Sequence, residues 1–176
     1  MSNYSPGYNY HPRPLKNLNK DERERTPPEF AEYLVGKMRL LFGDGVLAAL
    51  WVMSDTWYRH IPGIEIWDLQ RDATRYMGPW PIIAHPPCGP WGFLRSFSSE
   101  DYEHGVIAME YVHRYGGVVE QPSGSQLFRQ YGKPHIKPEV VYQCDFGHRA
   151  LKRTLLYWYK PIEIMSWGPR PRYRKR

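Results

Sequence analysis

The sequence predicts a three-layer α/β domain built on a mostly parallel sheet, and three observations lead to this expectation. The chain has 176 residues, of which 41% are apolar, and this suffices for one hydrophobic core but hardly for two. Short apolar runs of strand length alternate with stretches of helical periodicity. An expected strand at 81–84, helix at 98–115 and strand at 118–120 follow the order of a βαβ crossover, whose two strands run parallel.

The other elements follow from local signals along the chain. Thr26-Pro27-Pro28-Glu29 has the composition of a helix start in which Thr26 caps the first turn, and apolar residues at helical spacing continue to Gly43. Apolar runs at 46–52 and 63–67 predict the strands that open the sheet. Further strands are expected at 140–143 and 154–159, with a polar and basic loop at 144–153 between them.

We expect the domain to span 26–160, between an arm at 1–25 and a basic tail at 161–176. The arm has too little apolar content to offset the entropy of ordering it, so we expect it to be disordered. In the tail, Arg172 and Arg174 flank a tyrosine, a pattern that suits phosphate contact with stacking. A solvated tail is the alternative.

Composition favours one class of partner and excludes others. The formal net charge of +6 favours a polyanionic partner. No apolar run approaches the roughly 20 residues of a membrane span, and the N-terminus lacks the apolar core of a signal peptide. We therefore expect a cytoplasmic monomer without a membrane partner. Two cysteines do not make a disulfide framework, so each is core, ligand or nucleophile.

Two chemically active side chains follow the expected crossover strands. His85-Pro86-Pro87-Cys88 ends the strand at 81–84, and Glu120 ends the strand at 118–120. Because the carboxyl ends of parallel strands share the edge where open sheets bind ligands, Cys88 and Glu120 are expected to face one cleft. A buried structural thiol and an ion-paired strand end are the respective alternatives. We expect His85 to line the cleft wall.

These segments resemble the cytosine-5 DNA methyltransferase family, and more closely its short relatives in bacteriophages and bacteria, over residues 63–160. Pro87-Cys88 is similar to the Pro-Cys nucleophile loop, and Glu120-Gln121-Pro122 to the Glu-Asn segment. Phe146-Gly147 is similar to a Tyr-Gly pair that precedes two arginines. In an ungapped alignment, Lys152 and Thr154 replace those arginines.

The resemblance implies a Rossmann-like, methyltransferase-like fold, an enzyme that modifies carbon 5 of a pyrimidine, and DNA as its substrate and partner. Cys88 would add as a thiolate to ring carbon 6, a step that needs a soft nucleophile. Glu120, with a raised pKa, would act as the acid at ring N3 and the exocyclic amine. The base would have to leave the helical stack. Lys152 would assist as a third catalytic residue.

Several further side chains are candidates for contact with the nucleic acid. Cations near Cys88 would lower the pKa of its thiol from about 8.5. The candidate contact residues are Pro86, Pro87, Arg95, Arg149, Arg153, Thr154, Arg172 and Arg174. Trp91, Phe93 and Phe97 are candidates to stack on the base or to fill the core.

The resemblance also implies S-adenosyl-L-methionine as the methyl donor. Gly43-Asp44-Gly45 has the composition of the family's donor turn, although it follows an expected helix and not a strand. Candidates for the acidic donor contacts are Glu65, Asp68 and Asp72.

Two alternatives belong to other functional classes. His85-x-x-Cys88 and Cys144-x-x-x-His148 have spacings typical of zinc ligands, as expected for a zinc-stabilised DNA-binding module. In the second alternative, the chain is a catalytically inactive methyltransferase-like protein that binds nucleic acid or inhibits a host enzyme. Its partner would then include a host or phage protein.

Overall fold

The computed structural model describes residues 26–92, 96, 98 and 101–161, and a six-stranded mixed sheet forms its centre. The strand order is β2-β1-β3-β4-β6-β5. β2, β1, β3 and β4 pair in parallel, whereas β6 is antiparallel to both β4 and β5. The strands are β1 (Leu47–Leu50), β2 (Ile64–Trp67), β3 (Ile82–Ala84), β4 (Gly117–Pro122), β5 (Glu139–Tyr142) and β6 (Arg153–Tyr159). The expected mostly parallel sheet is thus a mixed one, because the last two strands form an antiparallel pair.

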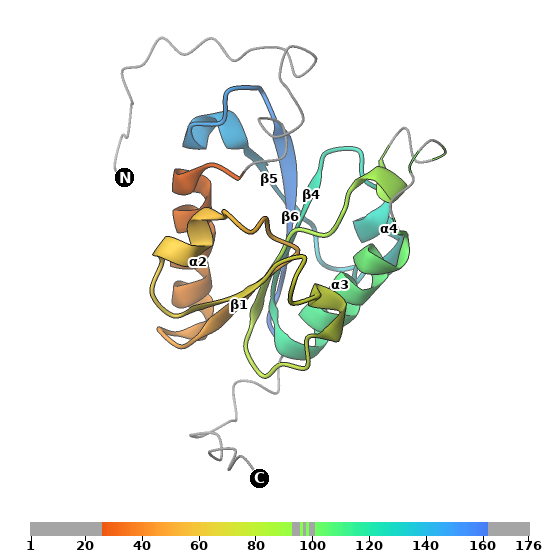
Figure 1. Ribbon diagram of the computed structural model, residues 1–176. Coiled ribbons are helices and arrows are strands. Elements are labelled where there is room, and N and C mark those ends of the chain that lie inside the picture. The colour runs from red at the N-terminus through yellow and green to blue at the C-terminus, as the bar shows by residue number, and fades with distance from the viewer. Residues whose placement is uncertain (1–25, 93–95, 97, 99–100, 162–176) are drawn as a thin grey trace.

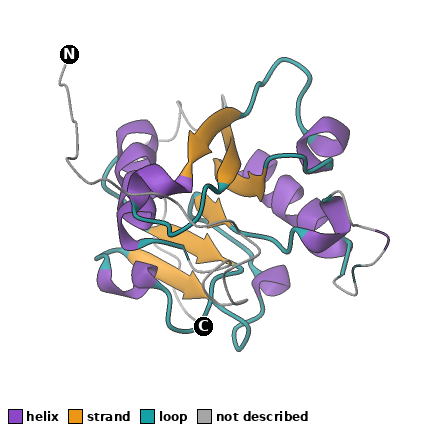
Figure 2. Ribbon diagram, turned by 90° about the horizontal axis from the view of Figure 1, so that it is seen from above, coloured by secondary structure: helices purple, strands orange, loops and turns teal. Residues whose placement is uncertain are grey.

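Helices cover both faces of this sheet, so the domain has three layers (Figure 1 and Figure 2). α2 (Pro28–Phe42) lies on one face, and α3 (Glu103–Tyr115) and α4 (Leu127–Tyr131) lie on the other. Successive strand side chains point to opposite faces. Ala49 and Ile83 accordingly pack in the core beneath α2, whereas their neighbours pack in the core beneath α3. The α/β expectation is confirmed at this level.

Most expected elements occur close to where the sequence places them. All six strands overlap their expected ranges. α2 ends as expected at Gly43, whose φ of 83° suits glycine. The capping box is wrong, however, because the N-cap residue is Pro27, whose carbonyl accepts the amides of Phe30 and Ala31. α3 begins at Glu103, whose amide donates to the Asp101 carboxylate at 2.8 Å.

Some expectations cannot be compared with the structure. The arm at 1–25 and the tail from 162 onward lie outside the described residues, together with Phe93, Arg95 and Phe97. Within the described part of the chain, no helix is long and apolar enough to cross a membrane.

Two helical glycines provide a matched test of this packing. A Cβ added at Gly105 in α3 would lie 2.2 Å from Nε1 of the buried Trp91 ring, whereas one added at the exposed Gly36 in α2 would meet nothing within 4 Å. Gly36→Ala should therefore raise the free energy of unfolding by up to about 1 kcal/mol through helix propensity. Gly105→Ala should lower it by about 1–3 kcal/mol through overpacking. Urea titration measures both, and equal stabilisation would contradict the observed position of Trp91.

Candidate functional site

The parallel pairing of β3 with β4 brings the two sequence-predicted segments together. Ala84 lies opposite Val119, so the residues that follow them, His85 and Glu120, meet at the carboxyl edge of the sheet. Nδ1 of His85 lies 3.2 Å from Oε2 of Glu120. The amide of His85 also donates to the carbonyl of Leu50 in β1, which fixes the start of the loop that leaves β3. The shared edge expected from the crossover is therefore present.

The loop that carries Cys88 is attached to the chain after Glu120 at two points. Nε2 of Gln121 donates to the carbonyl of Pro86 at 2.9 Å, and the amide of Gln126 donates to the carbonyl of Trp91 at 2.9 Å. Cys88 lies between these attachments and is exposed, just before the short helix Gly89–Trp91. The arrangement presents a thiol at the surface on a loop with fixed ends.

Glu120 is buried within a polar network. Nε2 of Gln143 donates to Oε1 of Glu120 at 3.1 Å and to the Thr154 hydroxyl at 3.0 Å. On the other side of His85, Nε2 lies 3.0 Å from the Tyr58 hydroxyl. Tyr58, Glu120, Gln143 and Thr154 are buried, and the side chains of His85 and Glu120 are each 11% exposed. The network thus holds Glu120 and His85 in one orientation.

The pKa of Glu120 is lowered, which corrects the expected raised value. Burial alone raises the pKa of this carboxyl, because it disfavours the charged form. The positive charge of Lys152 and the hydrogen bonds from His85 and Thr154 outweigh that effect. Glu120 is accordingly a carboxylate at neutral pH and not a proton donor. Burial, with the Glu120 charge next, also raises the pKa of Tyr58 well above its ordinary value, so the phenol is neutral.

The remaining candidates for nucleic-acid contact range from exposed to fully buried. Arg149 and Arg153 are exposed, and Lys152 is half-buried. Thr154 is fully buried and contacts Gln143, so the expected contact with DNA is wrong for this side chain. Pro86 is buried and Pro87 half-buried. Trp91 is 1% exposed, which selects its core role over stacking on the target base. Arg95, Arg172, Arg174, Phe93 and Phe97 lie outside the described residues.

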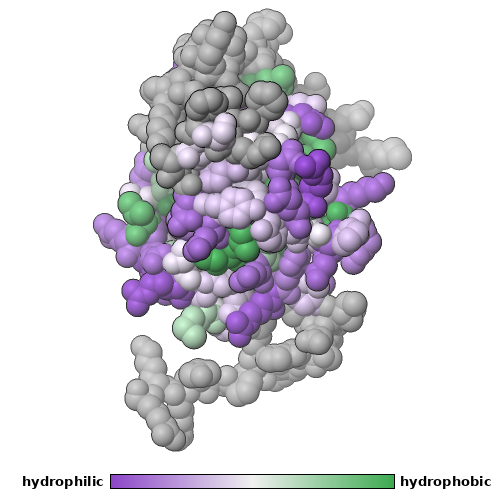
Figure 3. Space-filling view, turned by 90° about the vertical axis from the view of Figure 1, so that its right-hand side faces the viewer, coloured by the Kyte–Doolittle hydropathy of each residue, from purple (hydrophilic) through white to green (hydrophobic). Residues whose placement is uncertain are grey.

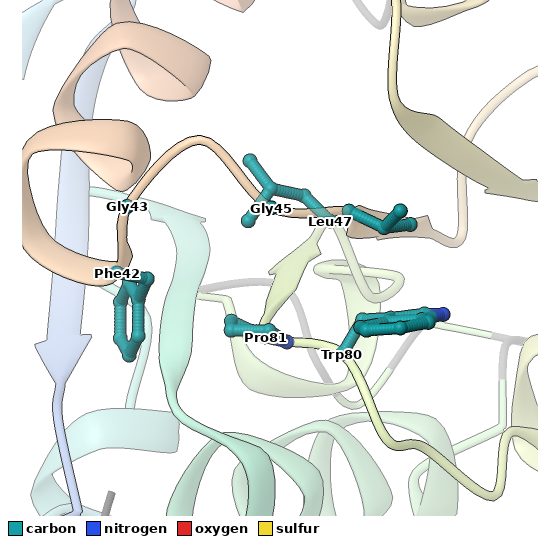
Figure 4. A pocket seen from close by; sticks show the side chains of 7 residues that line it. Phe42, Gly43, Gly45, Leu47, Trp80 and Pro81 are labelled. Atoms are coloured by element: carbon teal, nitrogen blue, oxygen red, sulfur yellow. The ribbon is translucent and has the colours of Figure 1, made fainter. Parts of the chain in front are cut away.

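The glycine turn expected to hold the methyl donor lies at the opposite edge of the sheet. Gly43 and Gly45 precede β1, and with Phe42, Trp80 and Pro81 they line a cavity of about 290 Å³ (Figure 4). Cys88 instead follows the carboxyl end of β3. A donor held at Gly43 and Gly45 would be separated from Cys88 by the length of the strands. The turn therefore does not fit S-adenosyl-L-methionine that reacts at this site.

The acidic donor candidates are engaged in structural contacts. Asp68 is buried at the end of β2, pairs with Arg59 at 2.7 Å and accepts two backbone amides. Glu65 pairs with Arg71. Asp72 caps the helix Ala73–Arg75 through the amide of Thr74. Of the three, only Asp68 occupies a strand end at the edge that carries Cys88.

The zinc alternative has little support from the positions of its ligands. Both ring nitrogens of His85 contact protein groups, namely Tyr58 and Glu120. Nδ1 of His148 accepts the amide of Ala150 at 3.0 Å. Within residues 26–92, 96, 98 and 101–161, no group of three or more histidine, cysteine or acidic side chains is arranged to hold a metal ion.

The sequence did not single out Tyr58, Gln121 or Gln143 as site residues. Tyr58 lies on a short helix, Trp57–His60, that no periodic pattern marks. Gln143 directly follows β5, and its contact with Glu120 depends on how β5 and β6 pair. Gln121 belongs to the Glu-Gln-Pro segment, which was the one available signal for it.

The lowered pKa of Glu120 gives a prediction about stability. A carboxyl with a lowered folded-state pKa stabilises the protein above its unfolded-state pKa, and this contribution disappears as pH falls through the folded-state pKa. Unfolding free energy should thus decline as pH falls from about 5 through the ordinary glutamate pKa of about 4.3 and below it. Glu120→Gln should cost about 1–3 kcal/mol at neutral pH and reduce this decline, because Lys152 loses its buried counter-charge.

Urea titrations at several pH values measure the decline. The exposed Glu110 supplies the control, since Glu110→Gln should leave the profile close to that of the unsubstituted protein. An unchanged profile for Glu120→Gln would show that Glu120 is not held as a carboxylate.

Comparison with known proteins gives no family for this chain. A scan against models of protein families, a search of curated proteins and a search of solved structures each returned no match. The case for a function therefore rests on the chemistry of the site.

Proposed function

We propose that the protein is a pyrimidine-modifying enzyme whose Cys88 thiol adds to carbon 6 of cytosine in DNA. The observation that supports this most directly is the contact between His85 and Glu120, at 3.2 Å, beside the loop that exposes Cys88. It combines a soft nucleophile, an imidazole and a carboxylate at the edge where open α/β sheets bind ligands.

The proposed step is an addition across the carbon 5–carbon 6 double bond. The Cys88 sulfur bonds to carbon 6, and the electron pair of the double bond takes a proton at carbon 5. Reversal breaks the sulfur–carbon bond and removes one of the two hydrogens now on carbon 5. The cycle regenerates cytosine and exchanges its carbon 5 hydrogen with water, so it needs no second substrate.

His85 and Glu120 have distinct roles in this proposal. The imidazole of His85 contacts Tyr58 and Glu120 through its two nitrogens, so it acts as a positioning residue at the start of the Cys88 loop. The Glu120 carboxylate orients this ring through its contact with Nδ1. Lys152 acts as a positioning residue, because its charge favours the ionised form of Glu120.

Methyl transfer is the established activity of the family that the sequence resembles, and S-adenosyl-L-methionine would supply a methyl group at carbon 5. The donor turn at Gly43 and Gly45 does not fit this role, since it lies at the other edge of the sheet. We therefore assign no group-transfer step to the described residues and confine the proposal to the addition.

The position of the glycine turn, at the edge of the sheet opposite Cys88, also favours a second candidate function. A glycine turn at the edge opposite Cys88 suits a nucleic-acid-binding protein that has no catalytic step. The two candidates differ in one measurable property, because only the enzyme makes a covalent bond to the base.

We predict that the protein releases tritium into water from DNA that carries cytosine tritiated at carbon 5. Cys88→Ala should reduce the release to the uncatalysed background, because no other thiol lies on this loop. Glu120→Gln should also reduce it, because the substitution removes the carboxylate that orients His85 at the start of the Cys88 loop. Counting of solvent tritium measures each rate.

The second cysteine provides the matched control. Cys144 is partly buried, and burial raises the pKa of its thiol, so Cys144→Ala should keep the full exchange rate. Exchange that survives in Cys88→Ala would overturn the assignment of the nucleophile. Binding of DNA without any exchange would favour the non-catalytic candidate.

A further inference from the structure

Two exposed tyrosines lie on a buried tryptophan beside the Cys88 loop. Tyr102 is 44% exposed and Tyr131 is 37% exposed. The Tyr102 and Trp91 ring centroids are 4.0 Å apart with an interplanar angle of 33°, and Tyr131 meets Trp91 edge-on at 5.6 Å. The two tyrosines come from the start of α3 and the end of α4, which are brought together on this face of the sheet (Figure 1).

The two rings are held in position by several independent contacts. The Tyr102 hydroxyl donates to Oε1 of Gln130 at 3.2 Å and lies 3.2 Å from the Tyr131 hydroxyl. Trp91 fits against α3 because Gly105 has no side chain there. An aromatic pair supported in this way loses little conformational freedom when it binds a flat ligand.

The tryptophan that supports this pair follows Cys88 by three positions in the chain. The amide of Trp91 donates to the carbonyl of Cys88 at 3.1 Å. Cys88 therefore begins a single helical turn, and Trp91, whose ring supports the two tyrosines, ends it. When a base leaves the stack to reach an enzyme, its neighbour loses a stacking partner. A pair of exposed aromatic rings beside this helical turn suits that neighbouring base.

The surroundings of the pair favour a nucleic acid over an apolar partner. Arg129 and Lys133, in the same segment of the chain as Tyr131, are exposed. Figure 3 shows that hydrophilic side chains cover most of the described surface on this side of the molecule, with only small apolar areas. A hydrophilic surface with exposed cations suits a polyanionic strand better than an apolar partner.

We propose that Tyr102 and Tyr131 form a stacking surface for the base next to the target cytosine in single-stranded DNA. The substrate is then a strand with unpaired bases and not a free nucleotide. This inference rests on the proposed function, because Cys88 defines where the target base lies.

The test uses a fluorescent single-stranded oligonucleotide with one cytosine, and the full chain carrying Cys88→Ala so that no covalent bond contributes. Tyr102→Ala and Tyr131→Ala should each weaken binding roughly 5- to 150-fold, the usual effect of losing one stacked base. Tyr102→Phe and Tyr131→Phe should bind as tightly as the parent, because the ring is kept. Binding of deoxycytidine monophosphate should not change in any variant, since it has no neighbouring base.

Tyr159 provides a matched control at the opposite edge of the sheet. It pairs at the start of β4 and packs edge-on against His113 at 4.9 Å, so Tyr159→Ala also removes an aromatic contact. Oligonucleotide affinity should remain unchanged in this variant. Unchanged affinity in folded Tyr102→Ala and Tyr131→Ala would overturn the proposal.

A second measurement does not depend on how well the alanine variants fold. Oligonucleotides that lack the base on one side of the cytosine are compared with the intact strand, using Cys88→Ala with the tyrosines intact. Loss of the neighbouring base on one side should weaken binding to the same extent as Tyr102→Ala or Tyr131→Ala does with the intact strand. A tyrosine variant tested with the strand that lacks this base should bind no more weakly than either single change. Additive losses, or equal affinity for all strands, would overturn the proposal.

These outcomes are separate from those of the exchange reaction. Tyrosine-dependent binding of the strand, with no tritium exchange by the unsubstituted protein, would support the stacking surface and reject the catalytic function. Exchange that proceeds equally well on deoxycytidine monophosphate would reject the stacking surface and keep the catalytic function.

Discussion

A carboxylate removed from water must be compensated by hydrogen bonds and opposite charge, and in this protein that requirement falls on Glu120. His85 and Gln143 contact its two oxygens, and Lys152 supplies the nearby positive charge. These groups come from the ends of β3 and β5 and from the start of β6. The carboxylate therefore links the parallel half of the sheet to the antiparallel half at the edge that carries the site.

The Cys88 loop depends on the same contacts. His85 is the first residue of this loop, and Gln121, next to Glu120, binds the Pro86 carbonyl. The far end is fixed on Trp91, which packs against α3. An exposed thiol is thus held on a loop whose position is set by buried polar groups. Preorganisation of this kind is what a covalent step requires, because the sulfur must approach one ring atom.

The sequence indicated the elements of the fold more reliably than their directions. Apolar runs and turn residues placed all six strands near their observed positions. Direction was accessible only for β3 and β4, where an intervening helix implies a parallel crossover. The antiparallel placement of β6 between β4 and β5 has no local signal, because a strand reads as the same alternation of side chains in either direction.

The sequence by itself determined that Cys88 and Glu120 follow neighbouring parallel strands, and hence that they share an edge. Only the tertiary structure decided the pKa of Glu120, because this pKa depends on burial, which raises it, and on Lys152, His85 and Thr154, which are distant in sequence and lower it. The tertiary structure also placed Gly43 and Gly45 at the other edge. A short motif specifies residue types and spacing, whereas the edge on which a turn lies depends on the element before it. The electrostatics of a buried group likewise depend on which distant charges the fold brings near.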